Sequence, residues 1–110
     1  MKAKIKIWLE CGDGVAFAEG RRLLLEAVDR LGSLNAAAKE MGMSYRAAWG
    51  KIRATEKVLG IKLLKVTTGG KGGGGAVLTE DAKRLMINFN TYKNRLNTLA
   101  EKEFKRIFGK

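Results

Sequence analysis

Histidine is absent from this chain of 110 residues, and cysteine occurs once, at position 11. Without histidine, the chain lacks the side chain most used for general acid–base catalysis and for transition-metal ligation. A single cysteine can form neither an intrachain disulfide nor a multi-cysteine zinc site. We therefore expect no enzyme, no catalytic residues, no metal site and no cofactor.

Proline is also absent. No run of about 18 apolar residues occurs, so we expect no transmembrane helix and no membrane partner. The first residues alternate lysine with apolar side chains and lack the continuous apolar core of a signal peptide, which predicts a cytoplasmic protein. Acidic residues are few, 11 against 22 lysines and arginines, for a net charge of +11. This excess favours a polyanion partner. The length predicts a single domain, residues 1–110.

The N-terminal segment, residues 1–14, reads as a strand and a turn. From Lys2 to Cys11 apolar and polar residues alternate, which is typical of a half-buried strand. Cys11 falls on the apolar face, so we expect it to be a buried side chain. A strand needs a partner, and this one is expected to pair with a second copy of the chain or to lie against another element.

Residues 19–60 predict three helices. The first, Glu19–Leu31, carries an apolar face and ends at Gly32; that face comprises Leu23, Leu24, Ala27, Val28 and Leu31. A short, alanine-rich helix follows at 33–41, and Gly42 ends it. Ser44 can then cap a helix over 45–59, whose expected buried stripe is Ala48, Ile52, Thr55 and Leu59.

Residues 61–79 predict a hairpin. Strand-like segments 61–67 and 76–79 flank a glycine-rich run. Lys71 in that run is followed by Gly72, so the run is not a P-loop, which needs Ser or Thr after the lysine. A flexible tip is the expected role, although bare amides could also contact a phosphate or a small oxyanion. Helix, turn, helix and hairpin together form a winged helix-turn-helix, the device that places a helix in the DNA major groove.

Residues 79–108 predict one long helix, capped by Thr79. Its apolar residues follow a heptad spacing: Ala82, Leu85, Phe89, Tyr92, Leu96 and Leu99. At 1.5 Å per residue the helix would be roughly 45 Å long, more than one small core covers. The first turns are therefore expected to pack on the domain and the rest to pair with a second subunit, with Leu85, Phe89, Tyr92, Leu96 and Leu99 as dimerisation residues. The alternative is a helix folded back on its own domain. The fold class is mainly α with a small β component, a winged helix-turn-helix with a long C-terminal dimerisation helix.

The candidate DNA contacts lie on the second helix of the motif and on the hairpin. Tyr45 and Arg46 stand at the N-terminal end of that helix, where base edges are closest, and arginine can bind guanine O6 and N7 together. Lys51 and Arg53 are assigned to phosphates. Trp49 either fills the edge of the core or lies against the sugar–phosphate wall. The remaining candidates are Ser33, Ser44, Lys65, Thr67, Thr68 and Lys71.

Two further features of this region bear on DNA. Residues 44–71 hold seven basic side chains against one acidic side chain, more than half of the chain's excess charge. Gly50 is unusual, because glycine inside a helix costs about 1 kcal/mol relative to alanine. Close approach of the backbone to DNA is one interpretation of its presence.

Two strings in the chain are similar to one known family: FAEGRRLLLEAVDRLGSLNAAAKEMGMSYRAAWGKI and TTGGKGGGGAVLT. They resemble the N-terminal winged-helix domain of ModE-type molybdate-responsive transcription regulators, which is related to LysR-type DNA-binding domains. The resemblance covers about residues 15 to 100. It implies a dimeric DNA-binding domain in which the SYRAAW helix enters the major groove, the glycine-rich hairpin is the wing, and the first and last helices build the dimer. Full-length members carry molybdate-binding domains after this point, so we expect a stand-alone protein to which oxyanion sensing does not transfer, and its small-molecule effector is unknown.

The sequence thus predicts a homodimeric regulator that binds double-stranded DNA. An adaptor that dimerises with a larger regulator is one alternative, and a regulator that responds to molybdate or tungstate is another. RNA binding by the winged helix is a further alternative.

Overall fold

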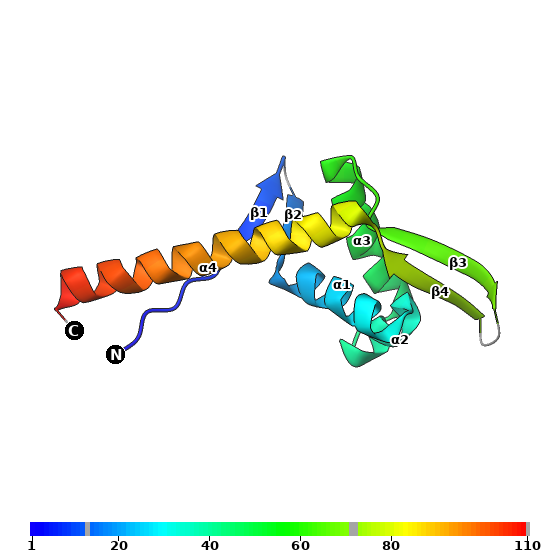
Figure 1. Ribbon diagram of the computed structural model, residues 1–110, viewed down its shortest axis with the longest axis horizontal. Helices are drawn as coiled ribbons and strands as arrows, with labels where there is room; N and C mark the ends of the chain where they lie inside the picture. The colour runs from blue at the N-terminus through cyan, green and yellow to red at the C-terminus, as the bar shows by residue number, and fades with distance from the viewer. Residues whose placement is uncertain (13, 71–72, 110) are drawn as a thin grey trace.

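The computed structural model describes residues 1–12, 14–70 and 73–109. Helices α1–α3 form the centre of the molecule, the β3–β4 hairpin projects on one side, and α4 extends on the other (Figure 1). The overall extents are 59 × 28 × 23 Å. The elements in chain order are β1 (Trp8–Cys11), β2 (Gly14–Ala18), α1 (Glu19–Leu31), α2 (Leu34–Glu40), α3 (Tyr45–Leu59), β3 (Leu64–Gly70), β4 (Gly73–Leu78) and α4 (Glu80–Phe108).

Helices α2 and α3 begin at serine caps and are separated by a glycine turn. The Ser33 and Ser44 hydroxyls cap α2 and α3 by accepting hydrogen bonds from Ala36 N and Ala47 N, at 2.9 and 3.0 Å. Gly42 forms the turn between these helices at φ 71°, a left-handed conformation that favours glycine. The predicted helix–turn–helix is therefore present with its predicted Ser44 cap, and Ser33 supplies a second cap that was not predicted from the sequence.

The buried stripe of α3 differs from its prediction at one end. Ala48, Ile52 and Thr55 are fully buried, as predicted, but Leu59 is 37% exposed. Glu56 is buried instead, and its carboxylate accepts a hydrogen bond from Leu63 N at 2.8 Å. Burial on α3 therefore ends at Glu56, before Leu59. The buried face of α1 is also shifted from its prediction, because Leu23 and Leu31 are exposed while Leu25 is buried.

The N-terminal strand is shorter than predicted and pairs within the chain. Only Trp8–Cys11 forms a strand, antiparallel to β2, with a register shift between Leu9 and Glu10. Cys11 is exposed, so its predicted burial is wrong. Cys11 lies at the tip of this hairpin, beyond the core, whereas Ala16 and Phe17 in β2 are buried next to α1. Alternation alone could not indicate where along the strand the core ends.

The β3–β4 hairpin is anchored at its base. Leu64 pairs with Leu78, and both side chains are buried. Ala76 N donates a hydrogen bond to Gly32 O at 2.9 Å, which attaches β4 to the end of α1. Gly75 allows this approach, because a Cβ there would lie 3.0 Å from Thr67 Oγ1 and 3.2 Å from Gly32 O. The hairpin thus occupies the position of the predicted wing.

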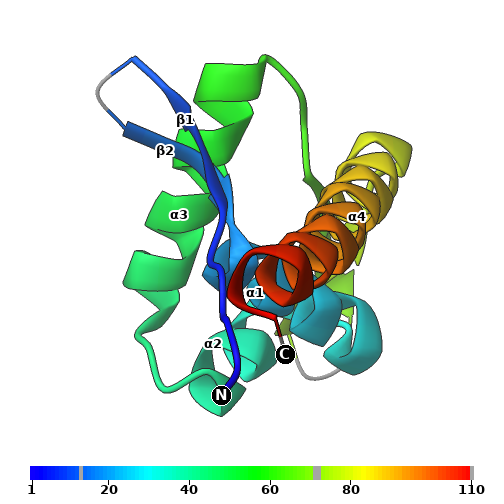
Figure 2. The same ribbon diagram turned by 90° about the vertical axis from the view of Figure 1, so that its left-hand side faces the viewer.

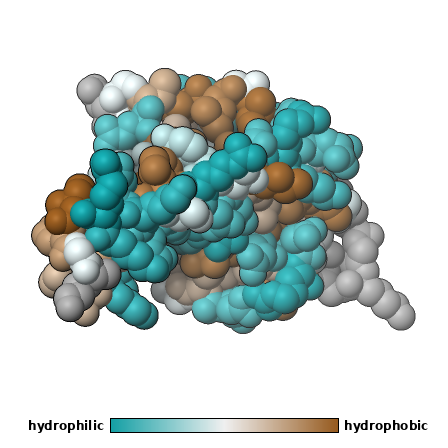
Figure 3. Space-filling view, turned by 60° about the vertical axis from the view of Figure 1, so that its left-hand side comes forward, coloured by the Kyte–Doolittle hydropathy of each residue, from teal (hydrophilic) through white to brown (hydrophobic). Residues whose placement is uncertain are grey.

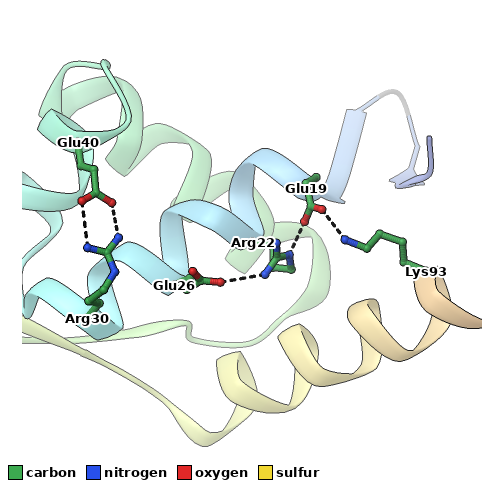
Figure 4. Close-up of polar contacts among 6 residues, drawn as sticks. All are labelled: Glu19, Arg22, Glu26, Arg30, Glu40 and Lys93. Atoms are coloured by element: carbon green, nitrogen blue, oxygen red, sulfur yellow. Dashed lines mark hydrogen bonds and ion pairs between the residues drawn. The ribbon is translucent and has the colours of Figure 1, made fainter. Parts of the chain in front are cut away.

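Helix α4 is one continuous helix of 29 residues. Thr79 caps it as predicted, accepting a hydrogen bond from Ala82 N at 3.1 Å. Its first half packs on the core, where Phe89 meets Phe17 edge-on with ring centroids 5.2 Å apart. Lys93 marks the end of this docking, with its Nζ 2.5 Å from the Glu19 carboxylate of α1 (Figure 4).

Beyond Lys93, α4 extends away from the three-helix core (Figures 1 and 2). The N-terminal arm lies beside this part, and residues of both line a groove of about 460 Å³. Among the described residues, no helix is both long enough and apolar enough to cross a membrane.

Candidate nucleic-acid interface

The N-terminal turn of α3 faces solvent. Ser44 sets the start of the helix through its cap, which leaves the side chains that follow it outside the core. Tyr45 is 50% exposed, and Arg46 and Ala47 are exposed as well. The two residues predicted to read bases therefore stand at an accessible helix end.

One face of α3, opposite its buried stripe, forms a basic surface. Arg46, Gly50, Arg53 and Lys57 follow one another at spacings of four, three and four, which places them on one side of the helix, and all four are exposed. Lys51 is exposed at the flank of this face. A Cβ added to Gly50 would have no heavy atom within 4 Å, so packing within the chain does not require glycine at this position.

Trp49 lies at the edge of the core, one of its two predicted environments. Its ring is half-buried against the core cluster. The Arg53 guanidinium carbon is 5.3 Å from the ring centroid, within range of a cation–π contact. Arg53 Nη1 also lies 3.8 Å from the Glu56 carboxylate. Trp49 and Glu56 thus both contact the Arg53 head group, which remains exposed.

Lys57 and Lys62 extend the basic surface beyond the predicted contact set. With Arg53, Glu56, Gly60 and Ile61 they line an open groove of about 450 Å³ after the end of α3. Lys57 could have been found in the sequence, because it stands four residues after Arg53 on the same helix face.

The other predicted contacts are spread over two elements. Ser33 is half-buried, and its hydroxyl oxygen already caps α2. Lys65 and Thr67 are exposed on β3, and Thr67 Oγ1 accepts a hydrogen bond from Gly75 N at 3.1 Å. Thr68 belongs to β3, but its side chain and Lys71 lie outside the described part of the structure. Their roles toward DNA stay predictions.

The predicted dimerisation residues divide into two groups. Phe89 is 2% exposed inside its own domain and is not available to a partner, so its assignment to the dimer seam is corrected; Leu85 is half-buried against the same core. Tyr92 and Leu99 are more than half exposed, and Leu96 is half-buried. Figure 3, which brings this side of the molecule forward, shows separate hydrophobic patches among hydrophilic side chains.

Metal chemistry has no support in the described residues, where no three His, Cys, Asp or Glu side chains gather into a possible metal site. Together, the site consists of an exposed basic helix face, a capped helix N-terminus and an adjacent hairpin. Such a surface suits a polyanion with a groove.

Comparison with known proteins identifies the family. Residues 23–83 match the model of "Bacterial regulatory helix-turn-helix protein, lysR family". The chain belongs to this family. The matched segment holds most of α1, all of α2 and α3, the wing and the first residues of α4, so it contains the basic surface and leaves out the N-terminal hairpin and the distal part of α4.

Curated relatives include a molybdenum-pterin-binding protein and transcriptional regulators named ModE. The chain is 42% identical over 76 residues to "Molybdenum-pterin-binding protein MopB" of Rhodobacter capsulatus, covering 69% of this chain and 28% of that protein. It is 40% identical over 87 residues to "DNA-binding transcriptional dual regulator ModE" of Escherichia coli, covering 78% and 33%. It is 36% identical over 108 residues to "Transcriptional regulator ModE" of Yersinia pestis, covering 97% and 39%. The chain thus spans about a third of the length of these relatives and resembles ModE-type regulators over that part.

Solved structures support the fold. The lysR-family chain superimposes with a TM-score of 0.52 on ArgP from Mycobacterium tuberculosis, at 22% identity, covering 78% of this chain and 30% of that one. The TM-score is also 0.52 for the chain in "Crystal structure of CbnR_DBD-DNA complex", at 24% identity, covering 81% and 92%. The predicted mainly α, winged helix-turn-helix fold is confirmed.

Proposed function

We propose that this lysR-family chain is a transcriptional regulator that binds double-stranded DNA in a sequence-specific way, with α3 in the major groove and the β3–β4 hairpin as the wing. The observation that carries the proposal is the exposed basic face of α3, which begins at the accessible end formed by Tyr45 and Arg46. Helix-turn-helix proteins read base edges with the N-terminal residues of this helix. The DNA-bound relative in the solved structures supports the same choice of ligand.

We also propose that the chain acts as a homodimer. Exposed apolar residues on α4, Tyr92 next to Lys93 and Leu99 beyond it, support a partner helix. In such a dimer two copies of α3 would meet successive major grooves, about 34 Å apart, on a near-palindromic site.

No effector is assigned to the chain. The names of some curated relatives mention molybdenum, but the match covers about a third of each relative. A thermal-shift titration with molybdate and tungstate decides whether the alternative of an oxyanion-responsive regulator applies.

The test of DNA binding begins with selection of a preferred duplex from a random pool, followed by affinity measurements on wild type, Arg46→Ala and Lys51→Ala. We expect Arg46→Ala to weaken binding by about 1–3 kcal/mol through the loss of one base contact, and to relax the base preference at that position of the duplex. Lys51→Ala should weaken binding to all sequences alike and reduce the salt slope by about 1. For about six phosphate contacts per dimer, the wild-type slope of log K against log salt should be near −5.

Three results would contradict the proposal. If the selection yields no preferred duplex, the adaptor alternative is favoured, in which the chain binds a larger regulator instead of DNA. Tighter binding to structured RNA than to the selected duplex would favour the RNA alternative. An Arg46→Ala variant with unchanged affinity and base preference would reject Arg46 as a reader while leaving DNA binding in place.

A further inference from the structure

A partly buried polar cluster connects α3 to β2 and α1. The side chain of Arg21 in α1 donates from Nη1 to Val15 O at 2.7 Å and to Thr55 Oγ1 at 3.1 Å. The Thr55 hydroxyl in turn donates to Ala16 O at 2.6 Å. The hydroxyl of α3 therefore meets β2 and α1, two consecutive elements that precede it by 34 to 39 residues.

Packing does not explain why position 55 carries a hydroxyl. Thr55 is fully buried in the stripe it shares with Ala48 and Ile52. Valine would fill the same volume there without a polar group that needs partners. The hydroxyl is retained together with two partners of good geometry, so it adds directional contacts to a surface that apolar packing alone would cover.

These contacts differ from the other side-chain hydrogen bond that holds α3. The Glu56 carboxylate binds Leu63 N, seven residues along the chain, and fixes only the end of the helix. The Thr55 contacts span 34 and 39 residues and attach the helix to the rest of the domain. Burial lowers the pKa of Arg21, but its guanidinium remains charged at neutral pH.

We propose that Arg21 and Thr55 are positioning residues that set the rotation of α3 about its own axis and thereby decide which side chains face the DNA. Ala48 and Ile52 are buried in the same stripe, but their apolar contacts are non-directional, whereas the hydrogen bonds of Thr55 depend on angle as well as distance. Arg46 and Arg53 lie on the opposite face of α3 from Thr55, so any rotation moves them directly. A binding site of this kind must be held to within about 0.5 Å and 10–20°.

The inference rests on the proposed function, and it predicts different effects on sequence-specific and sequence-independent DNA binding. A small rotation leaves the basic charge of α3 near the phosphates, so sequence-independent binding should persist. Base contacts depend on direction and should be lost first. The Arg21–Thr55 cluster therefore controls discrimination between sequences more than affinity for DNA in general.

The experiment compares Thr55→Val, which removes only the hydroxyl, with Thr55→Ser, which restores it. Ile52→Val is the matched control, because it removes one methyl group from the same stripe and keeps the cluster. Arg21→Met and Arg21→Lys test the donor in the same way. The first readout needs no DNA: residual dipolar couplings of the α3 amides, fitted against those of α1, report the orientation and rotation of α3. The second is the ratio of affinities for the selected duplex and for a random duplex, with the salt slope.

We expect Thr55→Val and Arg21→Met to change the residual dipolar couplings of α3 and to lower the affinity ratio at least tenfold. For Thr55→Val, the salt slope measured on random duplex should be unchanged. Thr55→Ser, Arg21→Lys and Ile52→Val should stay within about twofold of wild type. Unchanged couplings in Thr55→Val, or equal losses for both duplexes, would overturn the proposal. If the wild type prefers no duplex, the proposed function fails, and the couplings still decide the positioning role.

Discussion

The two halves of α4 carry the same apolar spacing but have different surroundings. Up to Lys93 the helix packs on its own domain, with Ala82 and Phe89 buried and Leu85 half-buried. After Lys93 the apolar side chains lie outside the core: Leu99, on the heptad spacing, and Ile107 and Phe108, on a face shifted from it, are each more than half exposed. One heptad pattern therefore serves two different contacts, one within the chain and one with the partner that we propose.

This difference shows what a periodic pattern determines. Spacings of three and four residues fix which side chains share a helix face, because they follow from helix geometry. They do not determine which residues cover that face. Phe89 is covered by Phe17 from β2, a residue distant in the sequence.

The largest expected effect separates the two halves by stability. Phe89→Ala removes a fully buried aromatic ring and should lower the free energy of unfolding by about 3–5 kcal/mol. In the dissociated chain, Ile107→Ala changes a side chain that is 68% exposed and should stay within about 0.5 kcal/mol. Urea unfolding followed by circular dichroism, at one fixed protein concentration below the dimer dissociation constant, measures both. Equal losses in the two variants would mean that the halves are packed alike.

The next effect separates the halves by association. Leu99→Lys places a charge in the exposed part of the seam and should raise the dimer dissociation constant roughly tenfold to a hundredfold, or about 1.4–3 kcal/mol. Ile87→Lys is the control, since Ile87 is 64% exposed on the near half and lies off the heptad positions. Sedimentation equilibrium gives both constants. A dimer that weakens with Ile87→Lys and not with Leu99→Lys would move the interface to another face.

The sequence predicts local features of this fold better than distant ones. Ser44 and Thr79 were predicted as caps because a cap depends only on the residues that follow it. Cys11 and Leu59 were predicted to be buried and are exposed, because burial depends on where the core ends, and a periodic pattern carries no such information. The contact between Arg21 and Thr55 joins residues 34 positions apart, and no local signal marks either as its partner. For the candidate interface, helix spacing placed Arg46 and Arg53 on one exposed face, whereas their function toward DNA stays a prediction.

The smallest expected effect concerns the boundary between the halves, where Lys93 contacts Glu19 (Figure 4). The hydrogen bond from Arg22, with a smaller one from Lys93, lowers the pKa of Glu19 below its usual value. A carboxyl whose pKa is lowered in the folded state stabilises the protein above its unfolded pKa of about 4.3, and this contribution is lost as the pH falls through the folded pKa. We therefore expect Glu19→Gln to be less stable than wild type at pH 7, by about 1 kcal/mol or less because the pair is partly exposed, and the difference to shrink toward zero below about pH 4.

Thermal unfolding of both proteins from pH 7 to pH 3 measures this difference. Glu40→Gln is the control, because Glu40 pairs with Arg30 and links α1 to α2 without touching α4. Hydrogen exchange distinguishes the two variants further: only Glu19→Gln should speed amide exchange in α4 near Lys93. Unchanged exchange there would mean that apolar contacts such as Phe89 with Phe17 hold the near half alone.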